Sequence, residues 1–256
     1  PYSLSHARDR IRSGLAAFSR LMTRDSSPSR RAFLTCCALA PMACASTNVA
    51  PRSNDDVTAR PDEIDPELLR LEQQSGGRLG VFAFSPGSKS FARSSGGVIA
   101  HRADERFAMC STFKWLLGAA VLERVDHGLL RLDQSVAYTE ADLLAPDPIT
   151  RPHVHEGQLP LGELCRGTIA TSDNTATNLI LRQLGGPAEL TRFLRAQGDD
   201  TTRLDRDEPS LNTNLPGDPR DTTTPRAMAT TLARLIGEDR LSSASREILA
   251  AWLVGC

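Results

Sequence analysis

The feature that most constrains the fold is a change of hydrophobic pattern near Phe107. Before it, the apolar runs at 79–84 and 98–100 each predict a short strand. After it, apolar residues recur at helical spacing, beginning with a helix predicted over 113–132. Two strands make only a marginal sheet on their own. The order therefore predicts an α+β fold, a helical domain with an incomplete antiparallel sheet.

The remaining patterns fill in this outline. Leu68, Leu69 and Leu71 continue a helical apolar stripe that begins at Ile64 and ends before Gly76. The segment 204–224 has little periodicity and is rich in Asp, Pro, Asn and Thr, which predicts a long loop; loops of this length are commonly functional. Further helices are predicted over 159–171, 175–184, 189–196, 225–236 and 245–254.

Composition excludes several classes of protein. The 256 residues are 40% hydrophobic and 24% charged, which is typical of a globular chain of one to two domains. The net charge is −1, so neither nucleic acid nor an anionic membrane is predicted as a partner.

The amino-terminal region predicts export. Residues 1–31 carry seven Arg against two Asp, and an apolar run too short to span a bilayer follows at 32–45. Ser29 to Leu34 resembles a twin-arginine signal, and cleavage is expected after Ala45. Lipidation of Cys44 is the alternative. An exported, periplasmic protein without a transmembrane helix is expected.

These patterns divide the chain into three parts. Residues 1–45 are predicted to be an upstream extension and export signal, with Met22 as the expected native start. Residues 46–63, rich in Asn, Asp, Pro and Arg, are predicted to be a linker. Residues 64–256 are predicted to form the catalytic domain.

The first chemical motif is Ser111-Thr112-Phe113-Lys114. Ser111 and Lys114 stand three apart at the start of an apolar helix, so their side chains share one face. A serine hydroxyl needs a neighbour to take its proton, and a partly desolvated lysine can do so. An ordinary helix start with a surface lysine is the alternative.

The second motif, Ser172-Asp173-Asn174, falls at a break between two helical patterns. The Ser172 hydroxyl could pass on a proton, and the Asn174 amide could hold a substrate carbonyl. A simple helix cap is the alternative, because all three residue types cap helices well.

The third motif, Glu208-Pro209-Ser210-Leu211-Asn212, lies in the predicted loop. Glu208 could act as general base on a water molecule that Asn212 positions. Pro209 permits a cis peptide bond that would aim Glu208 inward. A solvated acidic turn is the alternative.

Taken together, the three motifs are more specific than any one of them. Ser172 follows Ser111 by 61 residues, and Glu208 follows Ser172 by a further 36. This order resembles the class A β-lactamases, over about residues 64–255. The resemblance implies a β-lactamase/transpeptidase-like fold, hydrolysis of a small β-lactam, antibiotic resistance, a monomer, and neither metal nor cofactor.

The resemblance also implies a role for each acylation residue. Ser111 would be acylated by the β-lactam carbonyl, and Lys114 would accept or relay its proton. Ser172 would pass that proton to the leaving ring nitrogen. Whether Lys114 or Glu208 starts acylation is disputed for this family.

Five residues have implied roles after or around that step. Asn174 would bind the side-chain amide of the substrate. Glu208 and Asn212 would activate the water that hydrolyses the acyl-enzyme. Arg206 and Asp221 resemble the ion pair that closes the family's loop.

The sequence also departs from the family. No lysine follows Lys114, so the K-T-G motif is absent, and truncation before that motif with impaired activity is expected. Pro146 and Asp207 stand where relatives often carry bulky side chains, Cys110 is expected to be a small buried thiol, and Cys165 to lie in a helix core. His153 and His155 are expected on the surface. The alternatives are a DD-peptidase (a penicillin-binding protein) and an inactive remnant of a β-lactamase.

Overall fold

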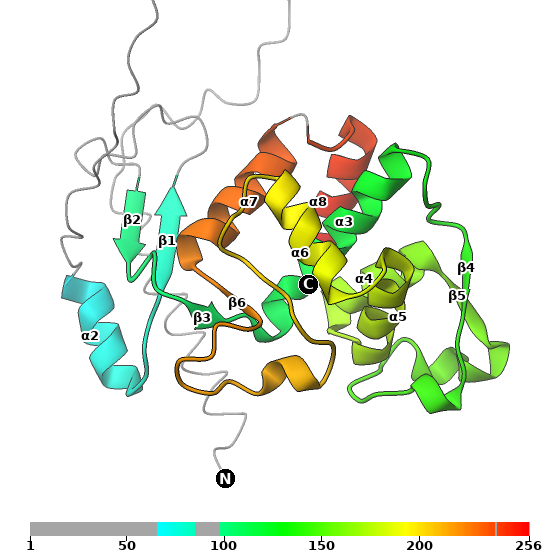
Figure 1. Ribbon diagram of the computed structural model, residues 1–256, viewed down its shortest axis with the longest axis horizontal. Coiled ribbons are helices and arrows are strands. Elements are labelled where there is room, and N and C mark those ends of the chain that lie inside the picture. Colours follow the sequence, from blue (N-terminus) through cyan, green and yellow to red (C-terminus); the bar gives the residue numbers. More distant parts are fainter. Residues whose placement is uncertain (1–65, 85–97, 239, 256) are drawn as a thin grey trace, which may run out of the picture. The chain divides into compact units, whose positions relative to one another are not determined.

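A computed structural model describes residues 66–84, 98–238 and 240–255 of the chain. Helices and short antiparallel strand pairs make up these residues, which confirms the predicted α+β class (Figure 1). The predicted export signal and the whole predicted linker, with Ile64 and Cys256, lie outside the described residues.

Three antiparallel two-stranded ladders form in the described part of the chain. The longest pairs Val81 with His101 and Phe84 with Val98, as the sequence predicts. Helix α2, which precedes this ladder in the chain, ends at Ser75, one residue before Gly76 with its left-handed φ. The elements are α2 (Pro66–Ser75), β1 (Val81–Phe84) with β2 (Val98–His101), β3 (Phe107–Ala108) with β6 (Thr222–Thr223), and β4 (Ser135–Ala137) with β5 (Gln158–Pro160).

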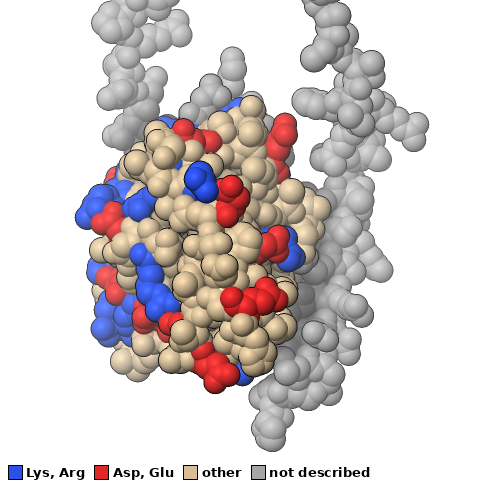
Figure 2. Space-filling model, turned by 90° about the vertical axis from the view of Figure 1, so that its right-hand side faces the viewer, with Lys and Arg blue, Asp and Glu red and all other residues tan. Residues whose placement is uncertain are grey.

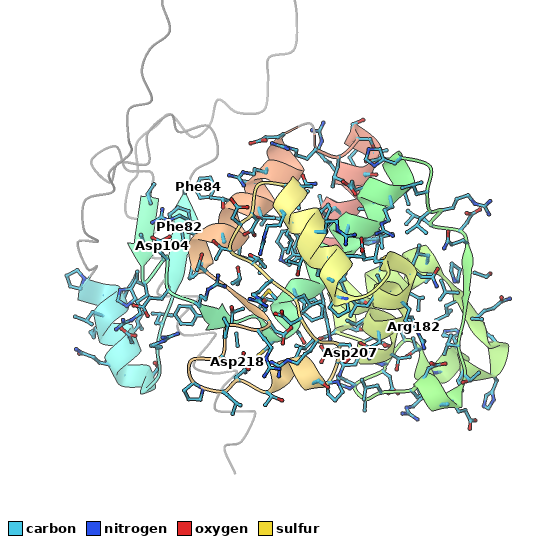
Figure 3. The ribbon with its side chains drawn as sticks, viewed as in Figure 1. Phe82, Phe84, Asp104, Arg182, Asp207 and Asp218 are labelled. Carbon is cyan, nitrogen blue, oxygen red and sulfur yellow. The ribbon has the colours of Figure 1, made fainter. Side chains whose placement is uncertain are left out.

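A buried carboxylate joins α2 to β2. Glu72 is 7% exposed and accepts hydrogen bonds from Arg102 Nε at 2.8 Å, Leu79 N at 3.0 Å and the His101 ring at 3.0 Å. Arg102, the Leu79 amide and His101 together lower the pKa of Glu72 to about 2. On the neighbouring strand, the ring centroids of Phe82 and Phe84 lie 5.5 Å apart, with the two rings tilted by 41° (Figure 3).

The helices enclose the apolar core. They are α3 (Lys114–Asp126), α4 (Leu161–Thr171), α5 (Asn174–Leu184), α6 (Pro187–Ala196), α7 (Pro225–Gly237) and α8 (Ser243–Val254). Each predicted helix is present, with two corrections of bounds. The helix predicted from residue 159 begins at Leu161, because Gln158–Pro160 pair with β4 as strand β5. The helix predicted to reach residue 132 ends at Asp126, because Gly128 adopts a left-handed φ of 69° and turns the chain away.

Helix α3 runs through the middle of this core, close to its neighbours. Leu116, Leu117 and Val121 are fully buried. A Cβ added at Gly118 would lie 2.6 Å from Ile169 of α4 and 3.4 Å from Trp252 of α8. The absence of a side chain at Gly118 therefore permits the close approach of α3 to both helices.

The predicted long loop is present between α6 and α7, and its part from 203 to 221 is called the 203–221 loop below. It contains one short 3₁₀ turn, Ser210–Asn212, and it bears Asp207 and Asp218 along its outer course (Figure 3). Leu204 and Leu211 bury their side chains, at 2% and 0% exposure, and so hold the loop to the core.

The surface matches the balanced charge of the chain. Acidic and basic side chains are interspersed on the face shown in Figure 2. Among the described residues, no helix combines the length and apolar character needed to cross a membrane.

Candidate active site

Ser111 lies in a 3₁₀ turn, Cys110–Phe113, that continues directly into α3. Its side chain is exposed, whereas Lys114, one turn later, is only 2% exposed. The predicted helical spacing thus places the hydroxyl at the surface of the helix end and the amine beneath it. Cys110, which precedes Ser111, has a left-handed φ of 43°.

The Lys114 amine is the centre of the site. Its Nζ donates to the Ser172 carbonyl and to Ser172 Oγ, both at 2.9 Å, and to Asn174 Oδ1 at 2.6 Å. Ser172 Oγ in turn donates to Ser111 Oγ at 3.0 Å. The first two motifs, 61 residues apart in sequence, therefore form one hydrogen-bonded chain.

The break between α4 and α5 explains how Ser172 reaches this position. Ser172 ends α4 with a left-handed φ of 60°, and Asp173 caps α5 by accepting from Ala176 N at 2.8 Å. Asp173 is fully buried and also accepts from the backbone of Ile149 and Thr150, each at 2.9 Å. The predicted cap is confirmed, since Asp173 caps α5, and its neighbours Ser172 and Asn174 both contact Lys114, as the functional interpretation of this motif requires.

The segment around Pro146 holds Asn174 from the other side. Asn174 Nδ2 donates to the Ala145 carbonyl at 3.0 Å, and Asn174 N donates to the Pro146 carbonyl at 2.8 Å. Pro146 is exposed, next to the proposed substrate-binding amide. Relatives of the resembled family often carry a bulkier side chain near this position.

Glu208 brings the third motif to the same amine. Its Oε1 lies 3.2 Å from Lys114 Nζ, and its Oε2 accepts from Asn212 Nδ2 at 2.7 Å. The Glu208–Pro209 bond is cis, as predicted, and Glu208 is 4% exposed. Apart from Lys114, no described residue contacts Oε1 within hydrogen-bond distance, so this oxygen faces the amine at the end of the hydroxyl chain.

Asn178 is a site residue that the motif search did not find. Its Nδ2 donates to the Glu208 carbonyl at 2.9 Å, and its Oδ1 accepts from Glu208 N at 3.0 Å. It stands four residues after Asn174 on α5, so it shares that helix face. This spacing is the only sequence signal that pointed to it.

The predicted ion pair closes the base of the 203–221 loop. Arg206 Nε lies 2.5 Å from Asp221 Oδ2, whose side chain is 1% exposed. Asp221 Oδ1 also accepts from the backbone amides of Asp205 and Arg206. The Asp221 carbonyl accepts from Met109 N at 2.9 Å, which ties the loop to the turn that bears Ser111.

The electrostatics of the site favour proton transfer. Burial lowers the pKa of Lys114 from its usual value, although Glu208 and Asp173 oppose this effect. A lysine with a lowered pKa is neutral in a larger fraction of molecules and can accept a proton. The arrangement can therefore deprotonate a serine hydroxyl and, through Glu208, a water molecule.

Comparison with known proteins identifies the family. A family model described as "Beta-lactamase enzyme family" matches residues 63–254, which is most of the chain. The chain belongs to the class A β-lactamase family. It is 42% identical to β-lactamase Toho-1 of Escherichia coli, over 88% of this chain and 72% of that protein. It is 44% identical to β-lactamase AST-1 of Nocardia asteroides, over 91% of this chain and 75% of that protein.

Solved structures agree. An ancestral class A β-lactamase is similar with a TM-score of 0.68 and 54% identity, over 74% of this chain and 70% of that one. A β-lactamase from Xanthomonas campestris is similar with a TM-score of 0.69 and 48% identity, over 73% of this chain and 67% of that one. Class A β-lactamase is thus favoured over the DD-peptidase alternative, and the chain is a hydrolase of the β-lactamase kind.

Two other expectations for this class A β-lactamase concern thiols and histidines. Cys165 lies in the core as predicted, and burial raises the pKa of its thiol. The prediction of a buried Cys110 is wrong: the turn before Ser111 leaves its side chain partly exposed. His153 pairs with Glu156 at 2.8 Å, and no cluster of three metal-binding side chains occurs in the described ranges.

Proposed function

We propose that Ser111 is the nucleophile of this class A β-lactamase and that Lys114, Ser172 and Glu208 carry its proton transfers. One observation carries the proposal: Ser111 Oγ, Ser172 Oγ, Lys114 Nζ and Glu208 Oε1 follow one another at 3.0, 2.9 and 3.2 Å. Four titratable or hydroxyl groups in such a continuous chain can move a proton without rearrangement of the backbone.

In the acylation step, Ser111 Oγ attacks the β-lactam carbonyl carbon, and the ring C–N bond breaks. The hydroxyl proton moves through Ser172 Oγ to neutral Lys114. It then returns through Ser172 to the ring nitrogen, which leaves as an amine. The 2.9 Å contact between Lys114 and Ser172 supports this route over one that begins at Glu208, since Lys114 stands between Ser172 and Glu208 in the chain of contacts.

In the deacylation step, Glu208 accepts a proton from water, and the hydroxide attacks the ester carbon on Ser111. The ester bond breaks, and the proton on Glu208 returns through Lys114 and Ser172 to the Ser111 oxygen, which restores the Glu208 carboxylate. The placement of Glu208 Oε1 against Lys114 and the amide of Asn212 on Oε2 support this role. Asn212 fixes one oxygen of the carboxylate, so the other can receive the water proton.

Asn174 is proposed to orient the substrate. Both ends of its amide group are hydrogen-bonded. Oδ1 accepts from Lys114, and Nδ2 donates to the Ala145 carbonyl. A fixed amide presents one donor and one acceptor, which suits the amide side chain of a penicillin. The ligand class is a small β-lactam, and no metal or cofactor takes part in these steps as proposed.

The proposal extends to the location of the enzyme. The arginine pair at residues 30–31 and the apolar run at 32–45 support export to the periplasm, with cleavage after Ala45. A lipid on Cys44 is the alternative form of the same exported protein. A monomer is proposed, as the resemblance to the class A β-lactamases implies. Mass spectrometry of the native amino terminus distinguishes cleavage from lipidation.

The test is a pair of neighbouring substitutions, Glu208→Gln and Asp207→Asn. We expect Glu208→Gln to slow deacylation by about 10³-fold, the scale of a general base, so that a penicillin adduct accumulates on Ser111. Asp207→Asn removes an exposed carboxylate one residue away and should leave turnover intact. Intact-mass time courses give the result.

Two outcomes contradict the proposal. An adduct located on a residue other than Ser111 excludes the nucleophile assignment. Equal deacylation in Glu208→Gln and Asp207→Asn, with circular dichroism unchanged, excludes Glu208 as the base that activates water.

A further inference from the structure

Asn214 contacts the turn that bears the nucleophile. Its Nδ2 donates to Cys110 Sγ at 3.4 Å, across 104 residues of sequence. Cys110 immediately precedes Ser111 and already has a left-handed backbone. This contact therefore joins the outer part of the 203–221 loop to the residue next to the reacting serine.

The backbone of Asn214 also supports the water-positioning residue. Asn214 N donates to the Asn212 carbonyl at 3.0 Å, and Asn212 Nδ2 donates to Glu208 Oε2 at 2.7 Å. The buried Leu211 lies just before Asn212, and Leu215, which follows Asn214, is 59% exposed. No apolar burial thus holds the loop at residues 212–215, and polar contacts must set its position there.

We propose that Asn214 is a positioning residue that fixes Asn212 and Glu208 relative to Ser111 through its hydrogen bond to Cys110. The proposal rests on the proposed function, because it concerns how the water base is aligned with the acyl-enzyme. Loss of the contact frees residues 212–215 to shift, and Asn212 then holds the Glu208 carboxylate less accurately. Deacylation slows, while acylation, which depends on Lys114 and Ser172 from the helices, does not.

The kinetic test separates these two steps. Asn214→Ala is expected to slow deacylation about threefold, the size of one modest neutral hydrogen bond, with the acylation rate unchanged. Thr213→Ala, an exposed neighbour on the same turn, is the matched control. Burst kinetics with a chromogenic cephalosporin measure both steps, and melting temperatures show whether the fold is intact.

A double-mutant cycle tests the partner. Cys110→Ala should reproduce the effect of Asn214→Ala, and the double variant should be no slower than either. Cys110→Ser keeps an acceptor and should restore part of the rate. Additive effects of Asn214→Ala and Cys110→Ala, or an equal loss in both kinetic steps, overturn the proposal.

A thiol measurement reads the contact without catalysis. Cys110 is partly exposed, whereas Cys165 is fully buried and serves as an internal unreactive reference. Alkylation of Cys110 by iodoacetamide, followed by peptide mass spectrometry, should be about threefold faster in Asn214→Ala. An unchanged rate of Cys110 alkylation in Asn214→Ala would contradict the proposed role of this contact. A wild-type chain that turns over no β-lactam contradicts the proposed function, whereas turnover unaffected by Asn214→Ala contradicts only this inference.

Discussion

Ser111 and Lys114 stand on a helix with an apolar inner face, whereas Glu208 stands on a loop held mainly by polar contacts. Leu116, Leu117 and Val121 of α3 are all fully buried. The 203–221 loop instead depends on the Arg206–Asp221 pair, on the Asn178 clamp and on two leucines. The half of the site to which we assign acylation is thus part of the core, and the half to which we assign water activation is attached to it.

This difference predicts which half fails first. Apolar packing is cooperative, so the helical half should be lost only with global unfolding. Polar loop contacts can open one at a time, at a lower free energy than the whole fold. A β-lactamase built this way can keep its acylation chemistry while losing its hydrolysis. Three substitutions test that contrast.

Lys114→Met has the largest expected effect and breaks the helical half chemically. It removes the amine that links Ser172, Asn174 and Glu208, so acylation should fall about 10³-fold. The acylation rate is measured by pre-steady-state kinetics with a penicillin. Arg166→Met, an exposed cation on α4, is the control and should acylate normally. Acylation retained in Lys114→Met would remove the lysine from the proposed proton route.

Asp173→Ala has the next largest effect and breaks the helical half structurally. The fully buried carboxylate accepts from Ile149, Thr150 and Ala176, and its loss leaves these amides without a partner. We expect the free energy of unfolding to fall by about 3 kcal/mol, measured by urea denaturation.

The control for that substitution is Asp200→Ala, which removes an exposed aspartate and should change stability little. An Asp173→Ala chain that unfolds at the wild-type urea concentration would mean that the helical half does not depend on this cap.

Asp221→Asn has the smallest effect and breaks only the loop half. Asparagine tolerates the left-handed φ of 56° and keeps the acceptor for two amides, so only the ion pair to Arg206 is lost. We expect about tenfold faster tryptic cleavage within the 203–221 loop and slower deacylation, with a nearly unchanged urea midpoint.

Asp218→Asn is the matched loop control, because its partner Arg220 is half exposed and such surface pairs contribute little. If Asp221→Asn instead lowered the urea midpoint as much as Asp173→Ala does, the two halves would form one cooperative unit.

The sequence predicted the helical half better than the loop half. The three-residue spacing of Ser111 and Lys114 implied one helix face, and the Ser172–Asn174 break implied a cap, because both are local rules. The cis bond before Pro209 was also anticipated, from the proline itself. Each of these depends on neighbours within one turn of chain.

Other features depend on distant contacts that no local rule contains. The exposure of Cys110 follows from where the 203–221 loop lies, and the Asn178 clamp requires that loop to pass over α5. The early end of α3 was missed because Leu130 and Leu132 continue the apolar spacing beyond Gly128, although they belong to the next turn of chain. Periodicity alone does not show where a chain changes direction.

The burial of Lys114 has a consequence for chemical labelling. The sequence contains two lysines, Lys89 and Lys114, against 28 arginines. Lys114 is 2% exposed and its amine already donates to three acceptors. An amine-directed acylating reagent can therefore modify Lys114 only after the site has opened. The labelling rate of Lys114, measured by mass spectrometry, therefore reports the rate at which the site opens. The measurement is simple because the protein contains only one other lysine.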